Sequence, residues 1–246
     1  MKILKRLAVS ILAIFVLIVV GFSIWAYTPA KPLPAALQSA ESAEVLDLGS
    51  GKSLVFMPKS EKPKTGLIFY PGGRVDYRAY SPMTEELAKA GYLVIIPRMP
   101  FNLAVFGYDR AADIIPEYPT ITNWVIGGHS LGGSMAAHYL IANQNFINGL
   151  VLVASYPAQS DNLTDYSGLV TSISGSLDGL AKPADIQASK KLLPPTTKFV
   201  EIAGGNHAQF GWYGPQAGDN PTTISRDEQQ KQLIAAIIEL LKSAEK

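Results

Sequence analysis

The most informative stretch of this sequence reads NWVIGGHSLGGS, residues 123–134. Its apolar first half is typical of a buried strand, and the small and apolar residues 133–140 are typical of a helix packed closely against a sheet. Between them lies Gly128-His129-Ser130-Leu131-Gly132, a Gly-x-Ser-x-Gly motif between strand and helix. This context predicts a nucleophile elbow, in which Ser130 attacks an acyl carbonyl.

The glycines of this motif meet a steric requirement. The elbow holds its serine in a sparsely populated backbone conformation, where strand and helix approach each other closely. The hydroxyl then stands at the end of the sheet beside the first turn of a helix. The positive end of that helix stabilises developing negative charge.

A serine hydroxyl needs an adjacent base because it is a poor nucleophile at neutral pH. Among the three histidines, His207 is the candidate, because it lies in Gly204-Gly205-Asn206-His207, directly after the last expected strand. His138 lies roughly 12 Å beyond Ser130 along the expected helix, so we assign it to packing or to the surface. The side chain of His129 is expected to point away from the serine, as a structural ring.

The base in turn needs a carboxylate that fixes its tautomer and stabilises the imidazolium. Asp178 is the candidate, since it follows the expected strand 169–174, and α/β sheets place their sites at the carboxyl ends of strands. The alternatives Asp161, Asp165 and Asp185 are typical of surface or turn residues. The predicted catalytic residues are therefore Ser130, Asp178 and His207.

The oxyanion of the tetrahedral intermediate needs preorganised N–H donors. One expected donor is the backbone N–H of Leu131, the residue after the nucleophile. The second is expected in the loop after the strand 65–70, where Gly73 is our choice and Arg74 the alternative. Glycine at this position lets the backbone approach the substrate closely.

Composition excludes several kinds of site. The chain has 246 residues, no cysteine and a formal net charge of +1. Absent cysteine excludes disulfides, thiolate metal sites and a thiol nucleophile, and the three histidines lack metal-ligand spacing. The charge is near neutral and no basic stripe is present, which argues against a nucleic-acid partner. We therefore expect neither a metal nor a nucleic acid.

The N-terminus is typical of a membrane segment. Lys2, Lys5 and Arg6 precede an uncharged run over residues 7–27. A helix of about 20 residues crosses the hydrocarbon core, and basic residues before it place the rest of the chain outside the cytoplasm. We favour an uncleaved signal anchor over residues 1–28. The alternative is a cleaved signal peptide, cut near Ala30 or Ser39-Ala40, which would give a secreted protein.

After the anchor, the sequence predicts a linker and one domain. Pro29, Pro32 and Pro34 break the helix and make residues 29–43 a stiff, proline-containing linker. From residue 44 to 246, apolar strands alternate with helices, which indicates a mostly parallel sheet covered on both faces. The expected strands are 45–48, 53–57, 65–70, 92–96, 122–126, 149–154, 169–174 and 198–203. One helix is expected after an N-cap at Ser81, and another after the capping box Ser225-x-x-Glu228.

Two segments bear on the substrate pocket. The segment between the strands 149–154 and 169–174 is too short for a large helical cap, so we expect an open site. The segment 208–216 after His207 is aromatic and glycine-rich. It either lines the acyl or alcohol pocket or covers the end of the sheet.

Together these residues resemble the alpha/beta-hydrolase superfamily. The order Ser130, Asp178, His207 is that of the superfamily, and the resemblance covers residues 44 to 243. It is strongest for small cap-less members of the dienelactone-hydrolase-like type. Serine replaces the cysteine of the dienelactone hydrolases here, which favours ordinary esters. The resemblance implies an alpha/beta-hydrolase fold with an eight-stranded, mostly parallel sheet, and no cofactor.

The leading hypothesis is a membrane-anchored serine hydrolase that cleaves small-molecule carboxylic esters through an acyl-enzyme on the extracytoplasmic side. An amidase or a thioesterase would need the same three residues. A catalytically silent fold that serves as a binding module of the cell envelope is the alternative from a different class. It is disfavoured because every catalytic position is filled.

Overall fold

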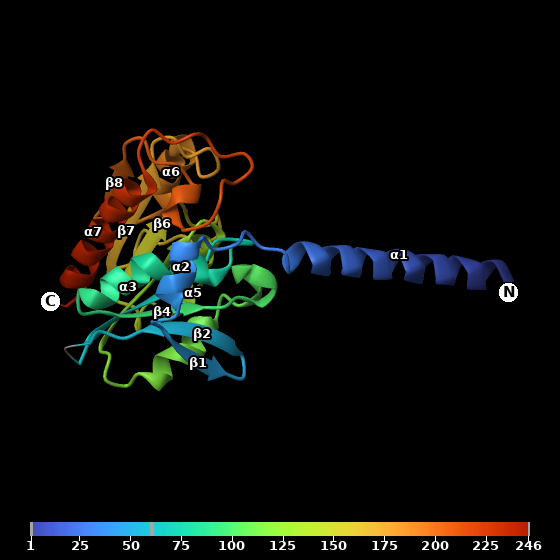
Figure 1. The fold of residues 1–246 in the computed structure, drawn as a ribbon, viewed down its shortest axis with the longest axis horizontal. Helices are drawn as coiled ribbons and strands as arrows, with labels where there is room; N and C mark the ends of the chain where they lie inside the picture. Colours follow the sequence, from blue (N-terminus) through green and yellow to red (C-terminus); the bar gives the residue numbers. More distant parts are fainter. Residues whose placement is uncertain (1, 60–61, 246) are drawn as a thin grey trace.

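A single eight-stranded sheet forms the centre of the computed structural model, which describes residues 2–59 and 62–245 (Figure 1). The strand order is β1-β2-β4-β3-β5-β6-β7-β8. Strand β2 pairs antiparallel with β1 and β4, and the remaining pairings are parallel. The strands are β1 (Glu44–Leu48), β2 (Gly51–Phe56), β3 (Thr65–Tyr70), β4 (Leu93–Pro97), β5 (Asn123–His129), β6 (Gly149–Val153), β7 (Leu169–Gly175) and β8 (Lys198–Ile202). The predicted mostly parallel sheet is confirmed.

Helices cover both faces of this sheet. They are α1 (Lys2–Ala26), α2 (Pro34–Ala40), α3 (Ser81–Lys89), α4 (Arg110–Ile114), α5 (Leu131–Asn143), α6 (Pro183–Ser189) and α7 (Arg226–Ala244). Short 3₁₀ turns include Tyr77–Tyr80, Pro100–Asn102, Ala104–Phe106 and Ala208–Phe210. No helix lies between β6 and β7 in the described residues, as the short segment there predicted.

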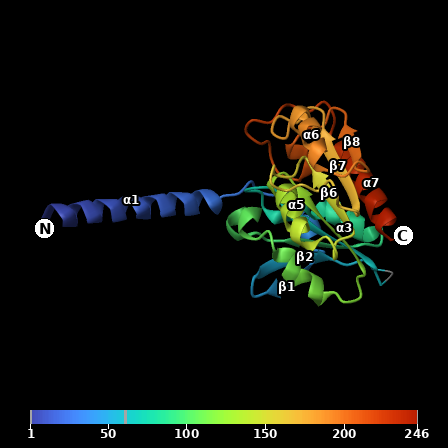
Figure 2. The same cartoon turned by 180° about the vertical axis from the view of Figure 1, so that it is seen from behind.

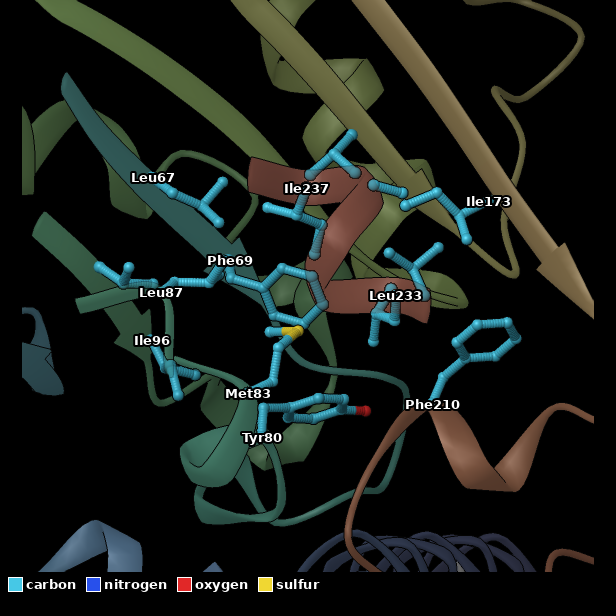
Figure 3. Packing of buried hydrophobic residues seen from close by; sticks show 14 of the residues in the cluster. Leu67, Phe69, Tyr80, Met83, Leu87, Ile96, Ile173, Phe210, Leu233 and Ile237 are labelled. Carbon is cyan, nitrogen blue, oxygen red and sulfur yellow. The ribbon is translucent and has the colours of Figure 1, made fainter. Parts of the chain in front are cut away.

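The core divides into two layers because successive residues of a strand point to opposite faces. On one face, Leu67 and Phe69 of β3 pack with residues of α3 and α7 (Figure 3). On the other, Ile68 and Tyr70 pack with residues of α4 and α5. Every residue of β3 and β4 is buried, which explains why both strands read as continuous apolar runs.

Ser81 is not the N-cap of α3, contrary to the sequence prediction. The 3₁₀ turn Tyr77–Tyr80 runs directly into the helix, so Tyr80 takes the N-cap position and Ser81 is already helical. At the start of α7, the N-cap half of the predicted capping box is present, because Ser225 Oγ accepts a hydrogen bond from Glu228 N (3.1 Å). The Glu228 side chain instead accepts from Gln232 Nε2 (2.9 Å).

Helix α1 projects from the domain (Figures 1 and 2). Its segment Lys5–Ala26 is long and apolar enough to cross a membrane. The linker that follows is held against the domain along its length. Ala30 pairs with Val75, Leu33 N donates to Trp212 O (2.8 Å), and α2 packs against α3.

The buried face of α7 should make a large contribution to stability. Ile237 is fully buried in the α3/α7 layer, whereas Ile238 is only partly buried. We expect Ile237→Ala to lower the free energy of unfolding by about 2–5 kcal/mol, because it removes apolar contacts and leaves a cavity. Urea unfolding measures this loss. Ile238→Ala has the same change in helix propensity, and an equal loss in that variant would contradict the packing described here.

Candidate active site

The turn between β5 and α5 consists of Ser130 alone. Its φ of 53° and ψ of −125° lie in a region that L residues rarely adopt. A Cβ at Gly128 would lie 2.5 Å from Tyr70 O, and one at Gly132 would overlap the same oxygen. Glycine is therefore required on both sides of the serine, as the motif predicts.

Asp178 and His207 form a buried pair at the carboxyl edge of the sheet. Asp178 follows β7 and His207 follows β8, and their side chains are 0% and 1% exposed. His207 Nδ1 lies 2.9 Å from Asp178 Oδ2. Because a carboxylate oxygen accepts, Nδ1 carries the proton and Nε2 keeps its lone pair.

Backbone N–H groups hold the other oxygen of this carboxylate. Asp178 Oδ1 accepts hydrogen bonds from Leu180 N (2.8 Å) and Ala181 N (2.7 Å). The orientation of the carboxylate is therefore fixed before any substrate binds.

Ser130 and His207 line the same cavity, which has a volume of about 270 Å³. The rest of its wall consists of Leu131, Ser134, Ala154, Ser155, Tyr156, Leu180 and Ala181. His207 Nε2 is buried and has no hydrogen-bond partner among the described residues. The fold thus brings His207 and the predicted nucleophile, far apart in sequence, to one cavity.

The two expected oxyanion donors are neighbours. Leu131 begins α5 and Gly73 lies in the loop after β3, where a Cβ on Gly73 would be 3.1 Å from the Leu131 side chain. Within the described residues, neither backbone N–H donates a hydrogen bond. By contrast, Arg74 N donates to Asn102 O (2.7 Å), which favours Gly73 over the alternative Arg74.

His129 lies behind the base as a buried ring. Its ring centroid is 4.4 Å from that of His207. Gly72 N donates to Tyr80 Oη (2.9 Å), and the same hydroxyl is hydrogen-bonded to His129 Nδ1 (2.9 Å). Burial, and then the neighbouring His207, hold the pKa of His129 well below its usual value. His129 therefore stays neutral and connects the loop of Gly72 to the base.

Asp219 is a residue that sequence reasoning missed. Its Oδ1 accepts from Gly179 N (3.1 Å), His207 N (3.2 Å) and Asn220 N (2.9 Å), and its Oδ2 accepts from Ala208 N (2.9 Å). One carboxylate thus joins the loop of Asp178 to the loop of His207. Its surroundings in sequence read only as a turn, so no local signal identifies it.

Two residues of α7 support the loop that carries His207. Gln229 Oε1 accepts from Asn206 N (3.0 Å) and its Nε2 donates to Asn206 O (2.7 Å). The Arg226 guanidinium donates to Ala208 O (3.2 Å), Tyr213 O (3.0 Å) and Gly211 O. These bonds hold the segment 208–216, whose Phe210 and Tyr213 are buried in the core. No residue of this segment lines the Ser130 cavity, and Phe210 and Tyr213 pack in the core instead.

The remaining histidine and aspartates lie elsewhere. His138 Nδ1 contacts Asp161 Oδ1 (3.1 Å). Asp161 is buried and donates from its N–H to Ala158 O (2.9 Å), so of the two expected settings it is a turn residue and not a surface one. Asp165 is exposed, and Asp185 accepts from Lys182 N (3.2 Å) at the start of α6. No group of three or more His, Cys, Asp or Glu side chains with metal-site geometry occurs in the part of the chain that the structure describes.

Comparison with known proteins finds one family and many solved structures. The family model described as "Alpha/beta hydrolase family" matches residues 66–231. No curated protein matches the chain. Similar structures include Est1E from Butyrivibrio proteoclasticus (14% identity, TM-score 0.59, covering 82% of this chain and 99% of that one). A thermophilic esterase from Thermogutta terrifontis has 14% identity, a TM-score of 0.61 and coverage of 82% and 99%. Alpha/beta hydrolase domain-containing protein 10 from mouse has 14% identity, a TM-score of 0.60 and the same coverage.

Asp219 should be needed to hold the base in place. We expect Asp219→Ala to lower the free energy of unfolding by about 1.5–3 kcal/mol, because backbone donors lose a charged acceptor. We also expect it to slow covalent labelling of Ser130 by a fluorophosphonate, since the loop of His207 loosens. The control is Asp165→Ala, at an exposed aspartate. Equal effects of the two substitutions would show that Asp219 has no special role.

The neutral His129 should make the protein sensitive to acid. Its folded pKa is depressed, so below a pH of about 6.5 the unfolded chain binds a proton that the folded chain does not. Stability should therefore fall by up to about 1.4 kcal/mol per pH unit as the pH drops below that value. His129→Asn keeps an acceptor for Tyr80 and removes the titrating group. Thermal unfolding at pH 5 and pH 7.5 should show that the variant loses less stability between these two pH values than the unchanged protein. An identical loss of stability would show that His129 is not its cause.

Proposed function

Since this chain belongs to the alpha/beta hydrolase family, we propose that it is a serine hydrolase that cleaves carboxylic esters of small molecules through an acyl-enzyme. The supporting observation is the buried pair of Asp178 and His207, because His207 lines the same cavity as Ser130 and its Nε2 has no other partner among the described residues. Similar folds include a protein described as an esterase, which agrees with an ester as substrate.

In the first half of the proposed reaction, Ser130 Oγ attacks the acyl carbon while His207 Nε2 takes the hydroxyl proton. The carbonyl oxygen becomes an oxyanion, which the N–H groups of Leu131 and Gly73 stabilise. Asp178 holds the imidazolium through Nδ1–H. The bond to the alcohol oxygen then breaks, and the alcohol leaves with the proton from His207.

In the second half, a water molecule attacks the acyl carbon of the acyl-enzyme. His207 Nε2 accepts the proton of this water and returns it to Ser130 Oγ as the acid leaves. The net reaction consumes one ester and one water and yields one acid and one alcohol.

We also propose that α1 stays attached and anchors the domain on the extracytoplasmic side. Basic residues before the apolar run support this orientation. Its retention is supported by contacts that cleavage would remove. A cut near Ala30 would break its pairing with Val75, and a cut at Ser39-Ala40 would remove the buried Ala36 from beside α3.

Substitution of the three proposed catalytic residues tests the reaction. Ser130→Ala should abolish fluorophosphonate labelling, because the probe bonds to the nucleophile. His207→Gln and Asp178→Asn should lower kcat for p-nitrophenyl esters by roughly 10⁴-fold, with residual turnover from the oxyanion donors.

The control is Ser134→Ala, which removes another serine of the same cavity. This variant should still be labelled. If Ser130→Ala is labelled as fully as the unchanged protein, the serine-hydrolase proposal is wrong, and a silent binding module becomes the better reading.

A further inference from the structure

Large apolar side chains are exposed where α1 meets the domain. Phe106 and Val105 of the segment between β4 and α4 are 52% and 41% exposed, and Trp25 and Tyr27 at the end of α1 are also exposed. We call these four residues and Phe101 the apolar collar. Figure 1 shows the green segment of the domain beside the point where α1 leaves. Contiguous exposed apolar side chains of this kind mark an interaction surface.

The collar reaches along the side of α1. Phe22 packs against Phe101 (5.6 Å between ring centroids) and Phe106 (6.5 Å), and Tyr27 packs against Phe101 (5.7 Å). Phe22 lies one turn before the helix ends at Ala26, about 6 Å along the axis. If α1 crosses a bilayer with Trp25 and Tyr27 at the interface, the collar therefore enters the layer where interfacial side chains insert.

The loop of the expected oxyanion donor holds this end of α1. Arg74, which follows Gly73, donates from Nε to Trp25 O (2.9 Å) and from a terminal nitrogen to Thr28 O (2.9 Å). Its guanidinium also lies 4.4 Å from the centroid of the Trp25 ring. The helix thus leaves the domain from the edge of the sheet that carries the active site.

The collar also continues to the active-site cavity. A Cβ on Gly73 would meet the side chains of both Leu131 and Leu103, so these two leucines flank the expected oxyanion donor. Leu131 lines the cavity of Ser130, and Leu103 lies between the two collar segments that carry Phe101 and Phe106. Leu103 and Leu131 thus place two partly buried apolar side chains between the segment of Phe101 and Phe106 and the cavity of Ser130.

Cations gather beside the same helix end. A cavity of about 720 Å³ begins at Tyr27 and Thr28. Its lining includes the basic residues Lys31, Lys52, Arg78 and Arg98. Asp76 also lines it and is bonded to Arg78 (2.6 Å). A net positive lining at this level matches the anionic headgroups of phospholipids.

We propose that the collar lies in the interface of the bilayer that α1 crosses, so that the active site opens at the membrane and takes esters of membrane-resident amphiphiles. This inference rests on the proposed function, for both the anchoring and the ester hydrolysis. An amphiphile reaches Ser130 along the apolar surface without passing through water. The alcohol of the amphiphile leaves first, with the proton from His207. Water then hydrolyses the acyl-enzyme and releases the acyl group as an acid.

The position of the collar can be measured because the chain contains no cysteine. Single cysteines at positions 14, 106 and 146 of the full chain are labelled with an environment-sensitive dye. The protein is then inserted into phosphatidylcholine–phosphatidylglycerol vesicles that carry nitroxide lipids. Phe146 is the matched control, since it is 71% exposed and precedes β6 at the opposite edge of the sheet. Ile14 lies within α1 and reports on anchoring.

We expect nitroxide lipids to quench the dye at positions 14 and 106 and to leave position 146 unquenched. Quenching at 14 with none at 106 overturns the inference and leaves the anchor intact. Absence of quenching at 14 overturns the proposed anchoring, and the inference with it.

Substrate preference gives the second test. The rates are compared for 4-methylumbelliferyl oleate within vesicles and for p-nitrophenyl acetate in water. Phe106→Asp should lower the ratio of the oleate rate to the acetate rate by roughly tenfold. This is the effect expected when one aromatic side chain is removed from an apolar phase. Phe146→Asp should leave the ratio within about twofold.

An equal ratio in both variants overturns the inference. Fluorophosphonate labelling of each variant shows that the site is intact. If the unchanged protein is labelled and hydrolyses neither ester, the proposed ester substrate fails, and the inference fails with it.

Discussion

The backbone turns from β5 into α5 within one residue, and the proposed site is built around this turn. Ser130 is held at a positive φ that costs about 1–3 kcal/mol. The cost is met by a rigid setting, because β5 lies between β3 and β6 at the centre of the sheet. Ser155 Oγ also donates to Ser130 O (2.6 Å), which holds the strained residue from the next strand's loop.

The other half of the site is built on loops, which a sheet alone does not position. Asp178 and His207 come after neighbouring strands, yet each strand ends before its functional residue. Asp219 joins the two loops, and Gln229 and Arg226 tie the loop of the base to α7. The inner face of α7 is packed in the core. The hydrogen bonds from α7 to the loop of His207 therefore hold the imidazole in a fixed position relative to the core. A catalytic geometry can therefore depend on residues that never contact a substrate.

What the sequence predicts also divides between the Ser130 turn, which depends on neighbouring residues, and the loops of Asp178 and His207, which depend on distant contacts. The strands and the glycines around Ser130 were predictable, because burial and close backbone approach act over a few neighbouring residues. The cap at Ser225 was predictable for the same reason, whereas Ser81 was not, since a 3₁₀ turn from Tyr77 precedes it. Asp219 and the contact of the buried Asp161 with the exposed His138 depend on partners in distant segments. A single aspartate in a turn carries no sign of such a partner.

The same kind of distant contact fixes how α1 leaves the domain. A flexible tether over residues 29–43 would let the domain rotate relative to α1, and the cavity of Ser130 would have no fixed direction relative to that helix. Here the hydrogen bonds of Arg74 with Trp25 and Thr28, and of Asn102 with Ala26 (2.9 Å), join the helix end to loops at the carboxyl edge of the sheet. Gly73 and Arg74 are consecutive, so the segment expected to bind the oxyanion also sets the direction of α1. One loop, that of Gly73 and Arg74, consequently determines both the orientation of the domain relative to α1 and part of the geometry of the proposed site.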